Sequence, residues 1–496
     1  MTGKVMESLN QFVNSLAPKL SHWRRDFHHY AESGWVEFRT ATLVAEELHQ
    51  LGYSLALGRE VVNESSRMGL PDEFTLQREF ERARQQGALA QWIAAFEGGF
   101  TGIVATLDTG RPGPVMAFRV DMDALDLSEE QDVSHRPYRD GFASCNAGMM
   151  HACGHDGHTA IGLGLAHTLK QFESGLHGVI KLIFQPAEEG TRGARAMVDA
   201  GVVDDVDYFT AVHIGTGVPA GTVVCGSDNF MGKPPNLTRT SPAGSGRNVV
   251  PASALLKVET RGASDVINQY VFDRAQQAIQ GAATMYGVGV ETRLMGAATA
   301  SSPSPQWVAW LQSQAAQVAG VNQAIERVEA PAGSEDATLM MARVQQHQGQ
   351  ASYQVLAIAV ETLARTALNF PGREVSDAGN LSFIDDAIEA DRQRYTDIAD
   401  QIWDHPETRF EEFWSAEHLA SALESAGFTV TRNVGNIPNA FIASFGQGKP
   451  VIALLGEYDA LAGLSQQAGC APTSVTPGEN GHGCGHIAGT AAFAAA

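Results

Sequence analysis

Three short segments of the sequence carry side chains that could bind a metal ion and activate water. In the segment HACGHDGH, Cys153 and His155 are two residues apart. In an extended backbone such residues point the same way, and Gly154 between them allows close approach. Thiolate and imidazole ligands suit Zn, Mn or Fe better than Mg or Ca. The alternative is a polar loop at a helix start, with Asp156 as the cap and the cysteine as a small buried residue.

A pair of adjacent glutamates forms the second candidate. Glu188 and Glu189 follow an apolar run in the segment FQPAEEG. Neighbouring carboxylates repel each other unless a cation holds one of them. One glutamate on a metal, with the other free as a general base, would provide the minimum for metal-assisted hydrolysis. Taken alone, the pair also fits a solvated acidic turn.

The third candidate is His213, at the end of the apolar run FTAVH. A lone histidine on a strand is more often a satisfied core residue than a ligand. The three segments nevertheless occur in order, each at the end of an expected strand or at a helix start. Ligands of α/β sheets bind beyond the carboxyl ends of the strands. Together the segments therefore predict a hydrolytic metal centre.

The elements that must position these residues alternate between helix and strand. This alternation is typical of an α/β domain with helices on both faces of a mostly parallel sheet. Short apolar runs predict the strands, and longer amphipathic stretches predict the helices. The expected strands cover 115–119, 179–184 and 209–213, and the expected helices cover 43–51, 70–96, 159–172 and 194–200.

Composition and charge narrow the class of protein. A length of 496 residues predicts about three domains, and 44% hydrophobic with 18% charged residues is typical of a globular chain. Lys plus Arg number 34 against 56 Asp plus Glu, so the net charge of −22 argues against binding to nucleic acid or anionic membranes. No apolar run approaches the length of a membrane span. Five sparse cysteines and the lack of a signal-peptide pattern predict a cytoplasmic protein.

The chain contains an internal repeat. The segments ESGWVEF, MDAL and ACGH near the start have the counterparts ETRFEEF, YDAL and GCGH near the end. The first copy has an additional stretch that covers 70–96. In the second copy, Cys484 and His486 correspond to Cys153 and His155. We expect this second copy to be the opening of an incomplete second domain.

The segments FRVDMDAL, MHACGHDGH, FQPAEEG and a later GSED at 333–336 resemble the motifs of the M20 family of metal-dependent peptidases and amidohydrolases. Within this family the chain is most similar to the branch of the aminobenzoyl-glutamate hydrolases and the auxin-conjugate amidohydrolases. Residues 1–370 resemble the A-type subunit of the aminobenzoyl-glutamate hydrolases. Residues 383–496 resemble the start of the B-type subunit.

The resemblance implies metal-dependent hydrolysis of the amide between an acyl group and an amino acid, with p-aminobenzoyl-glutamate as the expected small-molecule substrate. A pair of Mn or Zn ions would lower the pKa of a bound water and polarise the scissile carbonyl. Glu188 would be the general base, and Asp123 would support the site beside it. The metal ligands would be Cys153, His155, Glu189 and His213, with Cys484 and His486 as a second candidate pair.

The resemblance also implies a domain organisation. A three-layer zinc-peptidase-like α/β domain with a mostly parallel sheet would comprise 1–230 and 297–370. A reduced α+β lid would cover 231–296, a linker 371–382, and a partial second α/β repeat 383–496. The assembly would be a homodimer or a hetero-oligomer with a B-like subunit.

One departure from the family pattern concerns the lid. Only one strand–helix–strand half is expected, with strands at 254–259 and 288–294 and a helix at 264–285. This half contains no histidine, although the family lid contributes one to the site. It would also leave apolar faces uncovered.

A second departure follows Tyr353. The family places a strand and a loop with its last histidine ligand here, whereas this chain is expected to pass directly into a helix over 355–370. The nearby His347, in a glutamine-rich stretch, is interpreted as a solvated residue. A catalytically inactive fused subunit that binds only metal or a partner subunit is therefore the alternative to an active amidohydrolase.

Overall fold

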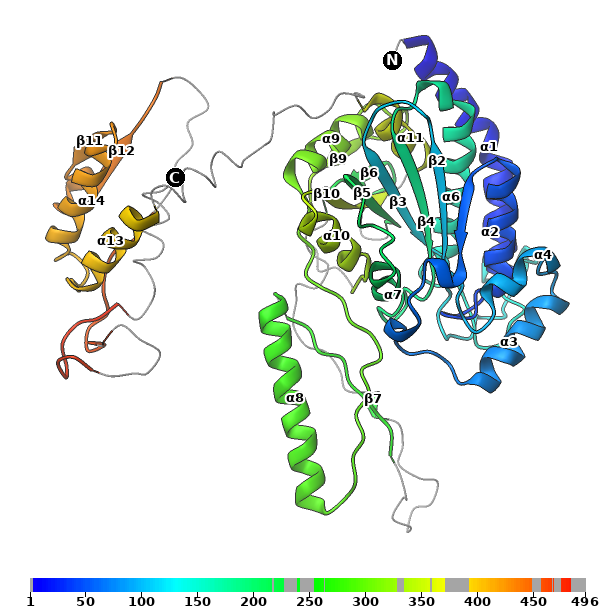
Figure 1. The fold of residues 1–496 in the computed structure, drawn as a ribbon, viewed down its shortest axis with the longest axis horizontal. Coiled ribbons are helices and arrows are strands. Elements are labelled where there is room, and N and C mark those ends of the chain that lie inside the picture. The colour runs from blue at the N-terminus through cyan, green and yellow to red at the C-terminus, as the bar shows by residue number, and fades with distance from the viewer. Residues whose placement is uncertain are drawn as a thin grey trace. The chain divides into compact units, whose positions relative to one another are not determined.

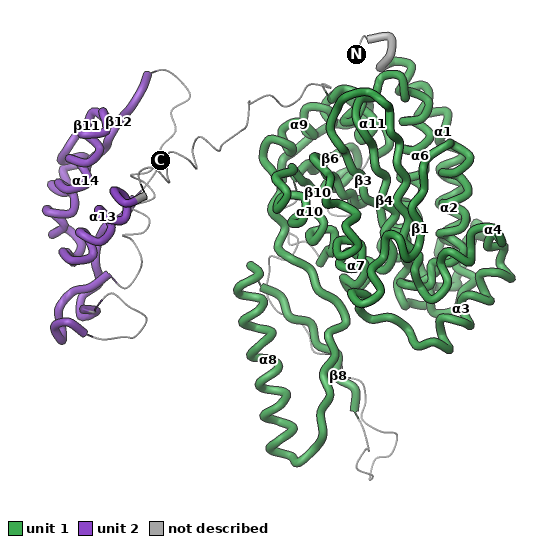
Figure 2. Tube along the Cα trace, in the orientation of Figure 1, with its two compact units in different colours: residues 1–374 green, residues 375–496 purple. Residues whose placement is uncertain are grey.

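The computed structural model divides into two compact units, residues 1–374 and residues 375–496 (Figure 2). No helix within the described ranges is both long and apolar enough to cross a membrane. The described residues are 3–215, 218–226, 239–240, 254–262, 264–327, 334–356, 359–370, 392–447, 456–465, 467 and 474–482.

An eight-stranded sheet forms the centre of the first unit (Figure 1). In spatial order its strands are β1 (Ser54–Leu57), β2 (Ile103–Asp108), β4 (Val179–Gln185), β3 (Val115–Asp121), β5 (Tyr208–Ile214), β10 (Gln350–Leu356), β6 (Thr222–Val224) and β9 (Gln323–Ile325). The four middle strands, β4, β3, β5 and β10, run parallel to one another. Antiparallel pairs occur at β1–β2, β2–β4 and β10–β6. The predicted mostly parallel sheet is confirmed.

Helices cover both faces of this sheet (Figure 1). One face carries α1 (Gly3–His29), α2 (Phe38–Gln50), α6 (His155–Gln171), α9 (Pro305–Ala315) and α11 (Val360–Asn369), and the other carries α7 (Ala194–Asp199) and α10 (Ala337–Gln346). Side chains of β3 alternate between the two layers, as a pleated strand requires. Met116 and Phe118 pack in the first hydrophobic cluster, and Ala117 packs in the second.

The predicted strands and helices occur with shifted ends. Helix α2 starts earlier than predicted, because the Glu32 carboxylate accepts hydrogen bonds from the amides of Arg39 and Thr40 at 3.0 and 2.8 Å. These two amides belong to the first helical turn, where no helical partner is available. The stretch predicted as one helix over 70–96 is divided into α3 (Glu73–Gln85) and α4 (Ala90–Ile93), and a further short helix, α5, covers Arg136–Arg139.

The lid prediction is partly wrong. Helix α8 (Asp265–Tyr286) occurs, but residues 288–294 form no strand, and the strand predicted at 254–259 shrinks to β8 (Leu256–Lys257), paired with β7 (Arg239–Thr240). A two-residue pairing provides little sheet for a further strand to join. Residues 227–238 and 241–253, at the predicted lid junction, lie outside the described residues. As expected, α8 leaves apolar side chains exposed, including Val266, Tyr270, Met285 and Tyr286.

The prediction of a helix from residue 355 is also wrong. Strand β10 continues to Leu356, and α11 begins at Val360. Val355 pairs with His213 on β5 and with Val224 on β6, so sheet pairing on both sides overrides the local helical pattern. The strand that seemed to be missing is therefore present. His347 is exposed, as predicted, and its Nδ1 lies 2.8 Å from a backbone oxygen.

The second unit repeats local features of the first. It contains α13 (Arg392–Trp403), α14 (Phe413–Ser425), β11 (Thr429–Arg432) and β12 (Phe441–Ser444). Glu407 accepts hydrogen bonds from the amides of Trp414 and Ser415 at 3.0 and 2.8 Å, as Glu32 does before α2. The sequence repeat is therefore also a structural repeat. The predicted linker at 371–382 and the candidate ligands Cys484 and His486 lie outside the described residues.

Candidate active site

The candidate residues of the first unit gather at the carboxyl ends of three neighbouring parallel strands. Asp123 lies two residues beyond β3, the glutamate pair follows β4, and His213 is near the end of β5. Helix α6 begins at the same edge with His155. Such an edge is where α/β sheets bind their ligands, because the loops that leave adjacent strands meet there.

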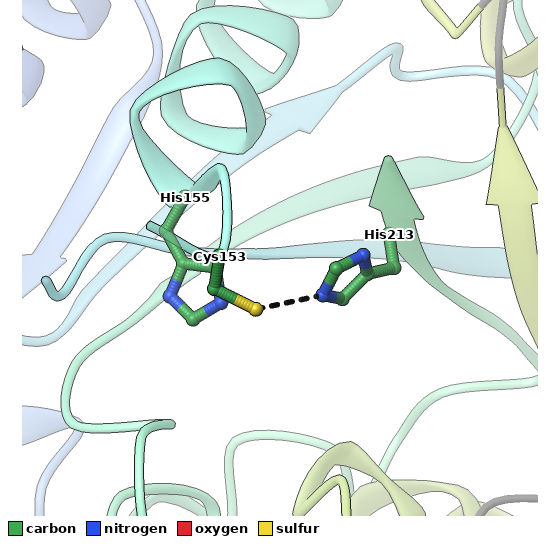
Figure 3. Close-up of side chains that lie close together, drawn as sticks. All are labelled: Cys153, His155 and His213. Carbon is green, nitrogen blue, oxygen red and sulfur yellow. Dashed lines mark hydrogen bonds between the residues drawn. The ribbon is translucent and has the colours of Figure 1, made fainter. Parts of the chain in front are cut away.

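The cysteine and two histidines lie close enough to share one ion. Cys153 Sγ lies 3.3 Å from His213 Nε2, and Figure 3 draws this contact as a dashed line. One ligand atom each from Cys153, His155 and His213 lie within 4.8 Å of one another. His213 Nδ1 lies 2.8 Å from the Ile214 carbonyl oxygen, which can only accept a hydrogen bond. His213 Nδ1 therefore carries the proton and Nε2 is left to bind a metal.

The local backbone differs from the one predicted. Gly154 has a φ of 96°, in the left-handed region, and α6 starts at the next residue. Cys153 and His155 are thus brought together by a left-handed turn at a helix start and not by an extended strand, so that prediction is wrong. The helix start expected in the alternative interpretation is present as well, but its N-cap residue is Gly154 and Asp156 lies inside the helix, so the prediction that Asp156 caps it is wrong.

Electrostatics favour the thiolate form of the cysteine. Burial acts to raise the pKa of Cys153, but the neighbouring imidazoles of His155 and His213 outweigh it and lower the pKa to about 6. The thiolate is the form of cysteine that binds metals.

The two glutamates also lie close to the imidazole of His155. His155 Nε2 lies 3.8 Å from Glu188 Oε2 and 3.8 Å from Glu189 Oε1. Burial, together with repulsion from nearby acidic groups, raises the pKa of Glu189 to about 8 and also raises that of Glu188. Two charged carboxylates this close together repel each other, and a nearby cation would relieve that repulsion.

Several buried atoms at this site find no hydrogen-bond partner. They are both ring nitrogens of His155 and Oε1 of Glu189. Buried polar atoms are rarely left unpaired unless a ligand or an ion satisfies them. The unpaired atoms and the mixed thiolate, imidazole and carboxylate donors fit a divalent metal ion.

Asp123 supports the loop that carries the glutamates. Its Oδ1 accepts a hydrogen bond from the Glu188 amide and its Oδ2 accepts one from the Glu189 amide, both at 2.9 Å. Asp123 Oδ1 also lies 3.4 Å from His155 Nδ1. The structure thus brings all six candidate residues of the first unit together, while their chemical roles stay predictions.

Sequence reasoning missed a buried histidine that orders the site. His158 Nδ1 lies 2.5 Å from Asp121 Oδ1, and His158 Nε2 accepts a hydrogen bond from the Ile214 amide at 2.8 Å. The backbone N–H of Ile214 can only donate, so Nε2 of His158 carries no proton and the ring is neutral, with its proton on Nδ1. Consistently, burial lowers the pKa of His158 to about 4. The last histidine of HACGHDGH was visible, but the sequence does not show that it faces Asp121.

A buried arginine was also missed. Arg119 is 0% exposed, and its guanidinium lies 2.7 Å from Asp121, 3.0 Å from Glu335 and 3.3 Å from Asp336. It also donates a hydrogen bond from Nε to Gln185 at 2.8 Å. The available signal was one arginine within the apolar run VMAFRVD, since a charge in a buried strand needs partners.

Replacing Arg119 by leucine is expected to lower the free energy of unfolding of the first unit by about 3–5 kcal/mol, because three buried carboxylates would lose their common cation. Arg343→Leu is the control: Arg343 forms a similar two-point pair with Asp204, at 2.7 and 3.1 Å, but on the surface. This variant should be nearly as stable as the wild type. Urea unfolding measures both, and equal losses would contradict the role given to the buried cluster.

Comparisons with known proteins all identify relatives in one family of hydrolases. The sequence model of the family described as peptidase family M20/M25/M40 matches residues 117–359. The A-type subunit of the p-aminobenzoyl-glutamate hydrolase of Escherichia coli K12 is 83% identical over 431 residues, which cover 74% of this chain and 99% of that protein.

The second unit and the fold have their own matches. The B-type subunit of the same Escherichia coli K12 hydrolase is 97% identical over 116 residues, which cover 23% of this chain and 24% of that protein. The crystal structure of an aminobenzoyl-glutamate utilization protein from Klebsiella pneumoniae matches with a TM-score of 0.66 and 58% identity, covering 74% of this chain and 100% of that one.

Proposed function

Because this chain belongs to the M20/M25/M40 family of peptidases, we propose that it hydrolyses the amide bond of p-aminobenzoyl-glutamate to give p-aminobenzoate and glutamate. It is a hydrolase that acts on amide bonds. The observation that carries the proposal is the assembly of Cys153, His155, His213 and the glutamate pair at one edge of the sheet, with unpaired ligand atoms among them. A divalent metal belongs to this site, and its donors support Mn or Zn.

The residues would divide into metal ligands, a proton carrier and a support. Cys153, His155, Glu189 and His213 would hold the metal, which when bound would supply Lewis-acid activation of water and of the amide carbonyl. Glu188 would accept a proton from the attacking water and pass it to the amide nitrogen of the departing glutamate. Asp123 would keep the glutamates in place through their backbone amides.

The number of tightly bound metals is expected to be one. The family's last histidine ligand has no counterpart after Tyr353, since the sequence contains no histidine between His347 and His405. His347 itself is exposed. A second metal would have to bind with fewer protein ligands and hence more weakly.

The proposed organisation places a catalytic domain in 1–230 and 297–370, a reduced lid in 231–296 and a partial second repeat in 383–496. The B-like character of the second unit supports a hetero-oligomer with a B-like subunit, with a homodimer as the other assembly. A cytoplasmic location is proposed from the sequence, in which five cysteines are few and odd in number. An inactive fused subunit is not favoured, because the proposed base and metal ligands of the first unit lie together.

The proposed substrate is tested with the full chain loaded with Mn or Zn. We expect release of p-aminobenzoate from p-aminobenzoyl-glutamate with a kcat/KM at least about tenfold above that for an aliphatic N-acyl amino acid such as N-acetyl-leucine. Product formation is followed by chromatography. Equal or greater activity on N-acetyl-leucine would replace the proposed substrate by a general deacylase activity, and no activity on either would contradict the function.

A further inference from the structure

The loop after β4 is held by buried carboxylates that come from distant parts of the chain. Asp123, after β3, accepts hydrogen bonds from the amides of Glu188 and Glu189. Asp336, at the start of α10, accepts hydrogen bonds from both amides of residues 193–194, at 3.0 and 2.9 Å. Asp123 therefore holds two consecutive amides in the first part of the segment 186–194, and Asp336 holds two consecutive amides at its end.

A third carboxylate, Glu37, holds the start of this loop. Glu37 Oε1 accepts a hydrogen bond from the Ala187 amide at 2.8 Å, and Oε2 lies 2.5 Å from the Thr101 hydroxyl. Glu37 is 0% exposed. It is the residue before α2, yet its side chain does not cap that helix, because Glu32 already binds the first-turn amides. Both oxygens of Glu37 are therefore free of the helix and bind the Ala187 amide and the Thr101 hydroxyl.

Ala187 is one of two residues of this loop, with Thr191, that are not glycine and yet have a positive φ. Its φ of 51° lies in the left-handed region, which residues other than glycine adopt at a cost. Such conformations persist only where the surroundings hold them in place. Ala187 directly precedes Glu188, so its backbone angles set the direction in which the next side chains leave the loop.

We propose that Glu37 is a positioning residue for the hydrolytic site, which holds the Ala187 amide and thereby directs Glu188 and Glu189 toward the metal ligands. The inference rests on the proposed function and adds to it a residue that touches neither substrate nor metal. Asp123 orders the two glutamates, whereas Glu37 orders the backbone bend that precedes them.

The chemistry of Glu37 defines a conservative variant. Burial, and then repulsion from Asp123, raise the pKa of Glu37 to about 8. In the structure the Glu37 carboxyl accepts from the Ala187 amide through one oxygen and from the Thr101 hydroxyl through the other. A glutamine oxygen can accept from the Ala187 amide, and its NH2 group can donate to the Thr101 hydroxyl, which accepts as well as donates, so Glu37→Gln should keep both contacts. Glu37→Met has a similar length and keeps neither.

The second unit provides a matched control. Glu412 is the residue before α14, is 6% exposed, and accepts a hydrogen bond from Asn439, which lies two residues before β12. Thr101 lies two residues before β2 in the same way. Glu412→Met therefore removes the corresponding carboxylate from the other copy of the repeat.

The test measures amide hydrogen exchange of residues 187–189, and kinetics on p-aminobenzoyl-glutamate, in the full metal-loaded chain. In Glu37→Met we expect exchange about tenfold faster, because one hydrogen bond is lost. We also expect kcat lower by about 10- to 100-fold, with KM changed less than about twofold and metal content unchanged. Glu37→Gln and Glu412→Met should behave as the wild type.

A rescue separates positioning from general stabilisation. Adding Ala187→Gly to Glu37→Met should restore part of kcat, since glycine adopts a positive φ without strain. Unchanged exchange in Glu37→Met, or a loss of metal and overall stability that accounts for its loss of kcat, would overturn the proposal.

Thr101→Val provides a second variant in case Glu37→Met does not fold. This substitution releases the other oxygen of Glu37, and exchange at 187–189 should rise; unchanged exchange in this variant would also overturn the proposal. Hydrogen exchange does not depend on turnover. A chain that shows the expected exchange but hydrolyses nothing would contradict the proposed function and still support the role of Glu37 in holding the loop.

Discussion

Replacing Glu188 by glutamine is expected to lower kcat for amide hydrolysis by a factor of about 10² to 10⁴, the range typical of a lost general base. Glutamine keeps the size of the side chain and the backbone hydrogen bond to Asp123. It cannot accept a proton from water. KM should change little, because Glu188 is proposed to act on the reacting groups and not on the remote parts of the substrate.

Steady-state kinetics at equal metal content measure this effect. Glu361→Gln is the matched control, because Glu361 is also a buried carboxylate, paired with Arg365 at 2.9 Å on helix α11. The control should retain the wild-type kcat. If Glu188→Gln were as active as the control, the general base would have to be another residue.

Removal of the metal is expected to have an effect of similar size. Dialysis against a chelator should lower the rate by about 10³-fold, equivalent to about 4 kcal/mol of transition-state stabilisation, and added Mn or Zn should restore it. The melting temperature should fall as well, because a ligand that binds only the folded state stabilises it. When no cation is bound, burial raises the pKa of Glu188 and of Glu189, so their charged forms are disfavoured in this site.

Even when Mn or Zn is supplied, His155→Ala should lose as much activity as the wild type loses on removal of the metal. His155 belongs to three groups of possible metal ligands among the described residues: one with Cys153 and His213, one with Glu188 and Glu189, and one with Asp121 and His158. His167→Ala is the control, since His167 lies on the same helix but bonds to Glu47 at 2.6 Å. Metal content by elemental analysis should fall only in His155→Ala. Full metal content in His155→Ala would show that the ion binds elsewhere.

Much of the fold and most of the site could be predicted from local sequence. The apolar runs of β3, β4 and β5 are short and continuous, as expected for buried parallel strands, so the edge on which their loops meet followed from their order. The ends of these elements carry ionisable residues that stand out beside the apolar runs: Cys153, His155, Glu188, Glu189 and His213. The family motifs then supplied Asp123.

The remaining features depend on contacts between segments far apart in the chain. The run after Tyr353 has a helical pattern, yet Val355 joins β10 because strands lie on both sides of it. Arg119 on β3 meets Asp336 at the start of α10 only when that helix packs on the sheet, and Glu37 reaches Ala187 only when α2 and the loop after β4 are packed together. No local periodicity in the sequence indicates such pairs.

Amide hydrolysis by this chain is proposed to depend on Glu188 at a metal centre in the first unit. The most direct measurement is the rate of p-aminobenzoate release from p-aminobenzoyl-glutamate per bound metal ion, for the wild type and Glu188→Gln side by side. We predict saturable turnover by the wild type and a rate at least about 10²-fold lower for the variant. No release by the wild type would contradict the proposed amide hydrolysis, and equal rates for the two chains would contradict the role of Glu188.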